Sequence, residues 1–214
     1  MCEISILDPR EASTGEQLDR ITSIYEAMPD GIGVVYVRES DDRTAFEYEV
    51  YKSITPNVSD IRDFIEENQD GAIRCVIHGR LATCGKVSKK NAHPIRVECD
   101  ECDVEYVAHN GTVYSREHRR RPLQEEGHTF QTPVDSEVIA HAFGEVPSSF
   151  EGADEFFEGQ PAYVLLGSDA MYIHASTGYH LTERGTVART YRSFGPERRT
   201  DNYQKVILTP TNGE

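Results

Sequence analysis

Strand-length apolar segments and helix-length amphipathic segments share this chain without alternating regularly. Strand patterns are expected at 3–7, 32–37, 45–51, 72–77, 104–108, 112–114, 163–167 and 170–175, with weaker alternation at 186–191 and 203–208. Helical periodicity is expected at 16–28, 59–68, 132–143 and 150–157. This mixture indicates an α+β fold, and two sheets covered by helices would accommodate this many strands.

Turn and cap signals suggest where several of these elements begin and end. Ser59 is a candidate N-cap for the second helix, and Thr132 is a candidate N-cap for the third. Asn110-Gly111 is a strong turn signal, and by itself it predicts a hairpin between 104–108 and 112–114. The charged segment 116–130 is expected to be an exposed loop.

Length and charge restrict the classes of function. The 214 residues predict a single domain over 1–214, and the net charge of −15 argues against a nucleic-acid partner. The one basic run, Arg119-Arg120-Arg121, is too short to change that expectation. An acidic chain with few lysines is typical of halophilic proteins. No apolar run is long enough to span a membrane.

The five cysteines indicate a reducing environment. Their number is odd and there is no apolar signal region, so a cytoplasmic location is expected. Cys99 and Cys102 form a CxxC pair, which is half of a zinc site, and Cys84 or His93 could complete it. The alternatives are two thiols without metal or a reversible disulfide, and no cofactor is expected.

Cys2 has a special chemical position. If Met1 is removed, the Cys2 thiol lies beside a free α-amine whose pKa is about 7.7–8.0. Such an amine can accept the proton of its own thiol, so that one residue supplies both nucleophile and base. The alternative is that Cys2 is an incidental second residue.

Several separated motifs occur in one order: MC at the start, HGRLATCG followed by NAHP, HNG, DSEVIAH and YVLLGSDAMYIHA. In these motifs the chain resembles the class II glutamine amidotransferases, whose glutaminase domain has the N-terminal nucleophile hydrolase fold. The resemblance covers about residues 2–175 and leaves 176–214 as a C-terminal extension. It implies a four-layer αββα sandwich.

The resemblance also implies a reaction. Cys2 would attack the side-chain amide of glutamine, form a γ-glutamyl thioester and release ammonia, with its own α-amine as the base. The Asn110 side chain and the Gly111 N–H would form the oxyanion hole. Read alone, these two residues are explained first as a plain hairpin turn.

The same resemblance assigns residues that bind glutamine. Arg80 would hold the α-carboxylate with help from Thr83, and Asp135 would hold the α-ammonium. His78 and His93 would shape the glutamine loop. Without the resemblance, Asp135 is explained as an acidic residue at a helix N-terminus.

One departure from the family pattern concerns the nucleophile. Glu3 stands where the family usually has glycine, and an acid beside the thiol could raise its pKa or signal lost activity.

The predicted function is therefore a glutaminase that supplies ammonia to another protein. Since only about 40 residues follow the matched region, the ammonia-accepting synthetase is expected to be a separate chain. The acceptor chemistry could be sugar-phosphate amination, asparagine formation or amidation of a deazaguanine base, and formation of a homo-oligomer is left open. One alternative is a catalytically inactive fold used as a structural or interaction module. Another is a different N-terminal nucleophile amidohydrolase, although Arg80 and Asp135 together suit an amino acid.

Overall fold

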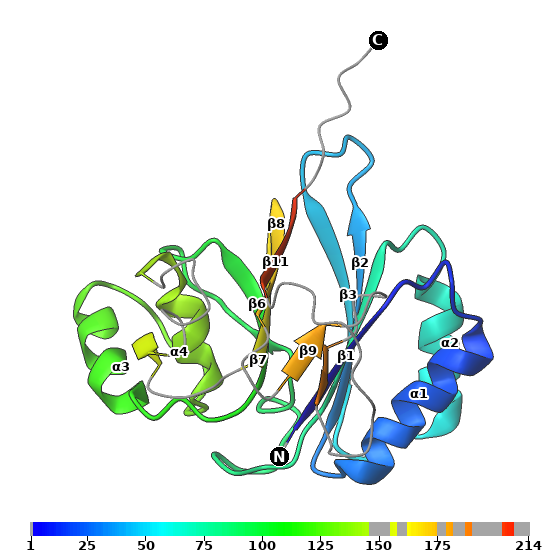
Figure 1. Cartoon of the computed structure of the whole chain (residues 1–214), viewed down its shortest axis with the longest axis horizontal. Coiled ribbons are helices and arrows are strands. Elements are labelled where there is room, and N and C mark those ends of the chain that lie inside the picture. The colour runs from blue at the N-terminus through cyan, green and yellow to red at the C-terminus, as the bar shows by residue number, and fades with distance from the viewer. Residues whose placement is uncertain are drawn as a thin grey trace.

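Two antiparallel sheets face each other and carry helices on their outer sides (Figure 1). The computed structural model describes residues 2–145, 155–157 and 162–174, together with the backbone of three strands at 179–181, 187–189 and 203–207. The predicted α+β class is confirmed, and the layers are those of a four-layer αββα sandwich. Within the described part of the chain, no helix combines the length and apolarity needed to cross a bilayer.

The first sheet has the strand order β1-β4-β2-β3, and α1 and α2 cover its outer face. Its strands are β1 (Glu3–Leu7), β2 (Ile32–Glu39), β3 (Phe46–Ser53) and β4 (Arg74–Gly79), and its helices are α1 (Thr14–Ala27) and α2 (Val58–Asn68).

The N-termini of both helices are capped by side chains. In α1, Ser13 and Glu16 form a reciprocal capping box. In α2, the Asn57 side chain accepts the Asp60 N–H at 2.8 Å. The prediction of Ser59 as the cap is therefore wrong, because Asn57 already satisfies this backbone donor and the helix begins at Val58.

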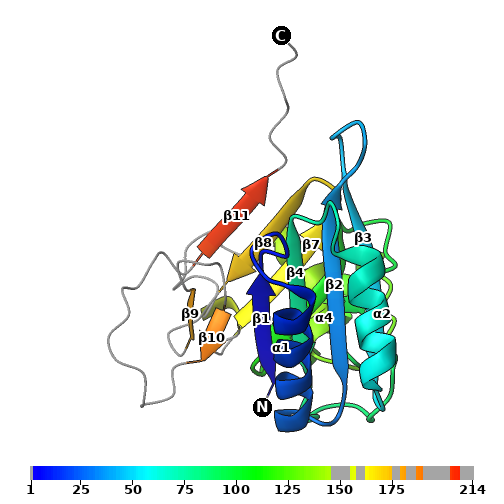
Figure 2. The same cartoon turned by 90° about the vertical axis from the view of Figure 1, so that its right-hand side faces the viewer.

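The second sheet has the strand order β11-β8-β7-β6-β5. Its strands are β5 (Ile95–Arg96), β6 (Val104–Asn110), β7 (Ala162–Gly167), β8 (Ala170–His174) and β11 (Tyr203–Ile207). The short connection between β7 and β8 is as predicted. Part of the expected C-terminal extension joins this sheet, since β11 pairs with β8, while β9 (Tyr179–Leu181) and β10 (Val187–Arg189) pair with each other (Figure 2).

Three apolar clusters hold the layers together. Between the sheets, Ile4 and Ile6 of β1 pack with residues of β7 and β8 such as Val164 and Ile173. A second cluster joins α1 and α2 to the first sheet, and a third joins α3 and α4 to the second sheet. Each sheet therefore buries residues on both faces, and central strands such as β2 and β7 are nearly continuously apolar.

The segment after β6 differs from the prediction. Residues 112–114 form no strand, and the helix α3 (Arg116–Glu125) occupies much of the expected loop. Leu123 is buried, and the guanidinium of Arg120 lies 4.2 Å from the centre of the Phe130 ring. Helix α3 therefore packs on the protein partly through the side chains of its arginines. A search for apolar residues at helical spacing does not count these arginines, so it misses the helix.

The helix after α3 also begins later than predicted. It runs over α4 (Ser136–His141) and continues into a short 3-10 turn at Phe143–Glu145. Thr132 does not cap it, because the Thr132 hydroxyl donates to Glu137 Oε2 at 2.7 Å. The predicted helix at 150–157 lies largely outside the described residues.

Candidate active site

A small, partly open pocket lies where β1, β4, β6 and the start of α4 meet. Six of the seven predicted site residues line it: Cys2, Arg80, Thr83, His93, Gly111 and Asp135. The seventh, Asn110, adjoins it through a hydrogen bond from its Nδ2 to the Cys2 carbonyl. Segments distant in sequence therefore meet at this pocket.

The Cys2 side chain is placed by the alternation of β1. Ile4 and Ile6 point into the core between the sheets, and the same alternation puts Cys2 on that side, at the pocket. Its Sγ lies 3.7 Å from the Leu81 carbonyl oxygen. Burial raises the pKa of the Cys2 thiol, although the contact with Leu81 and the positive charge of Arg80 oppose this change. At neutral pH the thiol is therefore protonated and needs a base.

Glu3 points to the opposite face of β1. Its carboxylate pairs with Arg20 of α1 at 2.9 Å, and Arg20 also donates to the Ser5 hydroxyl at 3.2 Å. Glu3 is absent from the residues that line the pocket. The side chain of Glu3 therefore adds no acid to the lining around the thiol.

Arg80 brings a buried positive charge to the pocket. Its side chain is 2% exposed and donates to the carbonyl oxygens of Cys84 at 2.6 Å and Lys86 at 3.3 Å. Its backbone is fixed by hydrogen bonds with Asp30 and Gly31. Among the described residues, no carboxylate forms an ion pair with Arg80. A buried guanidinium that binds only carbonyl groups is suited to accept an anion.

Asp135 brings a buried negative charge to the same pocket. It is 6% exposed, and its Oδ2 accepts the Val113 N–H at 2.9 Å. Within the described part of the chain it has no lysine, arginine or histidine as an ion-pair partner. The pocket thus presents one unpaired cation and one unpaired anion, whose opposite charges suit a zwitterion.

Asn110 and Gly111 end β6 beside Cys2. Gly111 has φ of 139°, a left-handed backbone conformation that side chains disfavour. The buried Asn110 uses Nδ2 for the Cys2 carbonyl, and its Oδ1 has no partner among the described residues. The amide nitrogen carries a second hydrogen. These residues therefore form a bend at the pocket in place of the predicted hairpin.

Sequence reasoning missed two residues that line the pocket and belong to a buried histidine network, His109 and Ser136. The Ser136 hydroxyl lies 2.7 Å from His93 Nε2 and 3.0 Å from His109 Nδ1. The His78 ring packs against the His93 ring with centres 4.2 Å apart and planes tilted by 33°, and His78 Nε2 lies 2.9 Å from the His109 carbonyl oxygen. Both missed residues stand inside recognised motifs, HNG and DSEVIAH, which was the only available signal.

Burial keeps these histidines neutral. It lowers the pKa of His78 to about 3 and that of His93 well below its ordinary value, and it also lowers the pKa of His109. A neutral imidazole can donate from one nitrogen and accept at the other. The network therefore holds the walls of the pocket and adds no charge to it.

The remaining predicted residues are distributed as follows. Thr83 is exposed at the rim of the pocket. Cys84 and His93 both line the pocket, so neither completes a site with Cys99 and Cys102 as was expected. That cysteine pair lies close to His128 and His141 instead.

Comparison with known protein families gives an independent result. A family model described as a glutamine amidotransferase domain matches residues 35–165, which is more than half of the chain.

Curated relatives point to the same family. The glutamine–fructose-6-phosphate aminotransferase (isomerizing) of Idiomarina loihiensis is 37% identical over 182 residues, which cover 80% of this chain and 27% of the relative. The enzyme of the same name from Methanocaldococcus jannaschii is 31% identical over 112 residues, covering 52% of this chain and 10% of that protein. This chain thus spans about a quarter of the length of the first relative.

Solved structures share the fold. The glutamine phosphoribosylpyrophosphate amidotransferase of B. subtilis has a TM-score of 0.54 at 16% identity and covers 87% of this chain and 41% of its own. A structure described as the allosteric regulatory enzyme of purine biosynthesis has a TM-score of 0.56 at 15% identity and covers 98% of this chain and 49% of its own. At these identities the likeness concerns the fold alone.

Proposed function

Since this chain belongs to the class II glutamine amidotransferase family, we propose that it hydrolyses the side-chain amide of glutamine with Cys2 as nucleophile. The observation that carries the proposal is the pair of buried, unpaired and opposite charges, Arg80 and Asp135, in the pocket that contains the Cys2 thiol. Glutamine carries the matching carboxylate and ammonium on its α-carbon. Its neutral side chain is then directed toward the sulfur.

The reaction begins once Met1 has been removed. The Cys2 α-amine takes the thiol proton, and Sγ attacks the γ-carbonyl carbon. The C–N bond breaks, the amine returns the proton to the leaving nitrogen, and ammonia departs. Water then attacks the thioester, which yields glutamate and restores the thiol. The raised pKa of Cys2 makes this base necessary at neutral pH.

The negative oxygen that forms in each attack needs fixed donors. The second hydrogen of Asn110 Nδ2 and the backbone N–H of Gly111 are proposed to supply them. Asn110 is held by its bond to the Cys2 carbonyl, so the donor and the nucleophile move together. Donors that are already in place before the attack do not have to reorient when the negative oxygen forms.

Substrate selection follows from the two charged side chains. The planar guanidinium of Arg80 can bind a carboxylate through two parallel hydrogen bonds. Asp135 receives the ammonium, and exposed Thr83 assists at the rim. An amide without an amino-acid head group would leave both charges unpaired, which disfavours its binding.

We further propose that residues 1–214 act as one glutaminase domain and that a synthetase partner binds the ammonia acceptor. The curated relatives are named for fructose 6-phosphate as well as glutamine, and the match covers only 27% of the first relative. We expect the purified chain to release ammonia from glutamine and to aminate fructose 6-phosphate only when a synthetase is supplied.

The decisive test is the intact mass of the purified protein before and after treatment with 6-diazo-5-oxo-norleucine. The expected result is loss of Met1 and one adduct, formed when Sγ displaces N₂ from the reagent. The Cys2→Ala variant should take no adduct. Cys84→Ser is the matched control, because Cys84 lines the same pocket and its removal should leave the label on Cys2. Retained Met1 without an adduct would refute the proposal.

A second test separates the head-group assignment from the nucleophile. Asp135→Asn keeps an oxygen that can accept the Val113 N–H but removes the charge. We expect KM for glutamine to rise by roughly tenfold or more, because hydrogen bonds to charged groups contribute about 1.5–3 kcal/mol. Folding should be unchanged by circular dichroism. An unchanged KM would exclude Asp135 as the ammonium site.

A further inference from the structure

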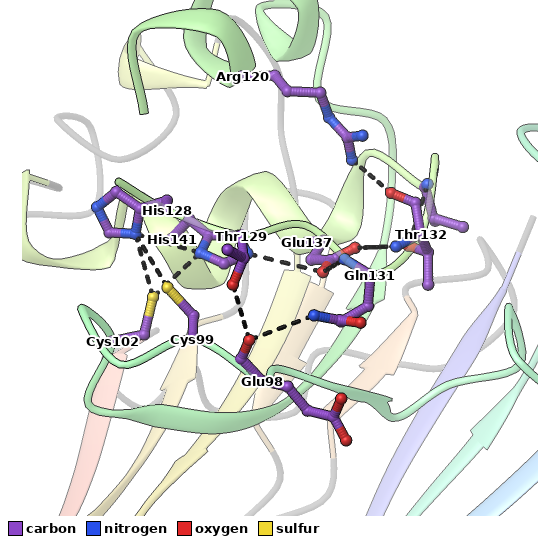
Figure 3. A network of polar contacts seen from close by, with 11 residues as sticks. Glu98, Cys99, Cys102, Arg120, His128, Thr129, Gln131, Thr132, Glu137 and His141 are labelled. Atoms are coloured by element: carbon purple, nitrogen blue, oxygen red, sulfur yellow. Dashed lines mark hydrogen bonds and ion pairs between the residues drawn. The ribbon is translucent and has the colours of Figure 1, made fainter. Parts of the chain in front are cut away.

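Two cysteines and two histidines converge on one point away from the pocket (Figure 3). One ligand atom from each of Cys99, Cys102, His128 and His141 lies within 4.8 Å of the other three. The proposed reaction uses none of these four residues.

Four of the six separations between the ligand atoms are close to those of a tetrahedral metal site, and all six are within 4.8 Å. Cys102 Sγ lies 3.0 Å from His141 Nδ1 and 3.4 Å from His128 Nδ1, and the two Nδ1 atoms are 3.3 Å apart. Cys99 Sγ lies 3.5 Å from His128 Nδ1. Bond lengths of about 2.3 Å to sulfur and 2.0–2.1 Å to nitrogen place tetrahedral ligands roughly 3.3–3.8 Å apart. A single ion at the centre would therefore need only small adjustments.

The four ligands come from three different segments. Cys99 and Cys102 belong to a tight turn between β5 and β6, closed by a hydrogen bond from the Cys102 N–H to the Cys99 carbonyl. His128 follows α3, and His141 is the last residue of α4. The cysteines pack against the apolar cluster under these helices, and His141 is 5% exposed. A metal here would join the sheet edge to both helices.

The ligand set favours zinc in a structural role. Two thiolates and two imidazoles are a common closed set for Zn²⁺, with no position left for a reacting water. Hydrogen bonds alone would join the four groups in pairs, whereas here His128 Nδ1 lies within 3.5 Å of all three other ligand atoms. A Cys99–Cys102 disulfide would leave both imidazoles without their sulfur partners.

A carboxylate lies beside the second nitrogen of one histidine. His141 Nε2, the nitrogen that faces away from the cluster, lies 3.6 Å from Glu137 Oε1. Glu137 also accepts the N–H groups of Gln131 and Thr132 (Figure 3). Zinc-binding histidines usually direct their second nitrogen to a carboxylate or carbonyl in this way.

We propose that Cys99, Cys102, His128 and His141 bind one Zn²⁺ ion that anchors the C-terminal end of α4. The other end of this short helix presents Asp135 and Ser136 to the glutamine pocket. A helix of six residues is not stable alone and takes its position from its anchors. The metal thus holds a wall of the pocket without contacting the substrate.

The metal content of the purified protein tests this proposal. We expect about one zinc per chain by mass spectrometry, and after exchange with Co²⁺ a thiolate-to-cobalt charge-transfer band with tetrahedral visible bands. Cys102→Ser and His128→Ala should each abolish these signals. Cys84→Ser and the exposed-histidine variant His118→Ala are the matched controls and should keep them.

Clear results would overturn the proposal. Wild-type protein that contains no zinc and binds neither Zn²⁺ nor Co²⁺ would exclude the site, as would a Cys99–Cys102 disulfide in freshly purified protein. If chelation removes zinc but leaves the melting temperature unchanged, the anchoring role is wrong. Because metal content is measured without glutamine, these results are independent of labelling at Cys2.

Discussion

Arg80 and Asp135 are buried in the pocket without ionic partners among the described residues. Burying an unpaired charge costs free energy, and a bound ligand of opposite charge offsets that cost. Arg80 relies on two carbonyl oxygens and Asp135 on one backbone N–H. Carbonyl groups satisfy the hydrogen bonds of a guanidinium but leave its charge uncompensated. A bound zwitterion would neutralise both residues at once.

The contribution of Arg80 can be measured with Arg80→Gln. Loss of a charge-assisted hydrogen bond of about 1.5–3 kcal/mol should raise KM for glutamine roughly 10- to 150-fold. The effect on kcat should be smaller, because the head group is bound before and during the reaction. The matched control is Arg62→Gln on the exposed side of α2, for which both constants should stay unchanged. Equal kinetics for the two variants would contradict the assignment.

The buried histidines predict an acid-sensitive fold. The folded pKa of His78 is about 3, whereas its ordinary value is 6.5, so the unfolded chain binds a proton first as pH falls. Stability is therefore complete above pH 6.5 and is lost progressively toward pH 3, by about 1.4 kcal/mol per pH unit for each such histidine. Urea unfolding at several pH values between 6.5 and 5 should show this slope.

A variant identifies the source of that slope. His78→Gln keeps a donor for the His109 carbonyl but cannot titrate, so its slope should be smaller by about 1.4 kcal/mol per pH unit. His118→Gln changes an exposed histidine of α3 and should keep the wild-type slope. If His78→Gln and the wild type behave alike, His78 is not a neutral buried group.

Among the elements, β2 and the loop that carries His93 are in unusually close contact. A Cβ atom at Gly33 would overlap the His93 carbonyl oxygen, and the Pro94 ring is also near. His93 contacts Ser136 at the start of α4. The absence of a side chain at one position of β2 therefore allows the loop, the histidine network and α4 to assemble.

Gly33→Ala should consequently destabilise the protein by about 1–3 kcal/mol or more, because the added methyl group forces the loop outward. Glutaminase activity should fall with it. Gly15→Ala is the control: nothing lies within 4 Å of the new Cβ in α1, so that variant should be more stable by about 0.5–1 kcal/mol. Denaturant unfolding of both variants decides the matter, and a neutral Gly33→Ala would contradict the close contact.

The molecule as a whole carries a net charge of −15 on a four-layer fold. Like charges repel across the folded surface, and salt weakens this repulsion because the Debye length falls from about 10 Å at 0.1 M to about 3 Å at 1 M. We propose that this acidity adapts the protein to high salt.

The melting temperature should therefore rise when NaCl is increased from about 0.1 M to about 1 M. A variant with Asp63→Asn, Glu66→Gln and Glu67→Gln on the exposed side of α2 removes three negative charges and should gain less from salt. A melting temperature that stays constant or falls with NaCl would show that repulsion does not limit stability.

The sequence alone was sufficient wherever neighbouring residues share a burial pattern. The spans of β1, β2, α1 and α2 follow from local periodicity, and β7 and β8 follow from two apolar runs around a short turn. The motifs around Cys2, Arg80 and Asp135 also predicted six of the residues that line the pocket. Local patterns indicate burial because side chains point to the same face at every second residue of a strand and at every third to fourth residue of a helix.

Only the tertiary structure decided features that depend on distant partners. Glu137 binds residues 131 and 132 and delays the start of α4, while Arg120 makes a charged segment into a packed helix. The meeting of Ser136 with His109, and of Cys102 with His128, depends on loop paths and strand register. No local period encodes such contacts, because they are set by how the layers pack against one another.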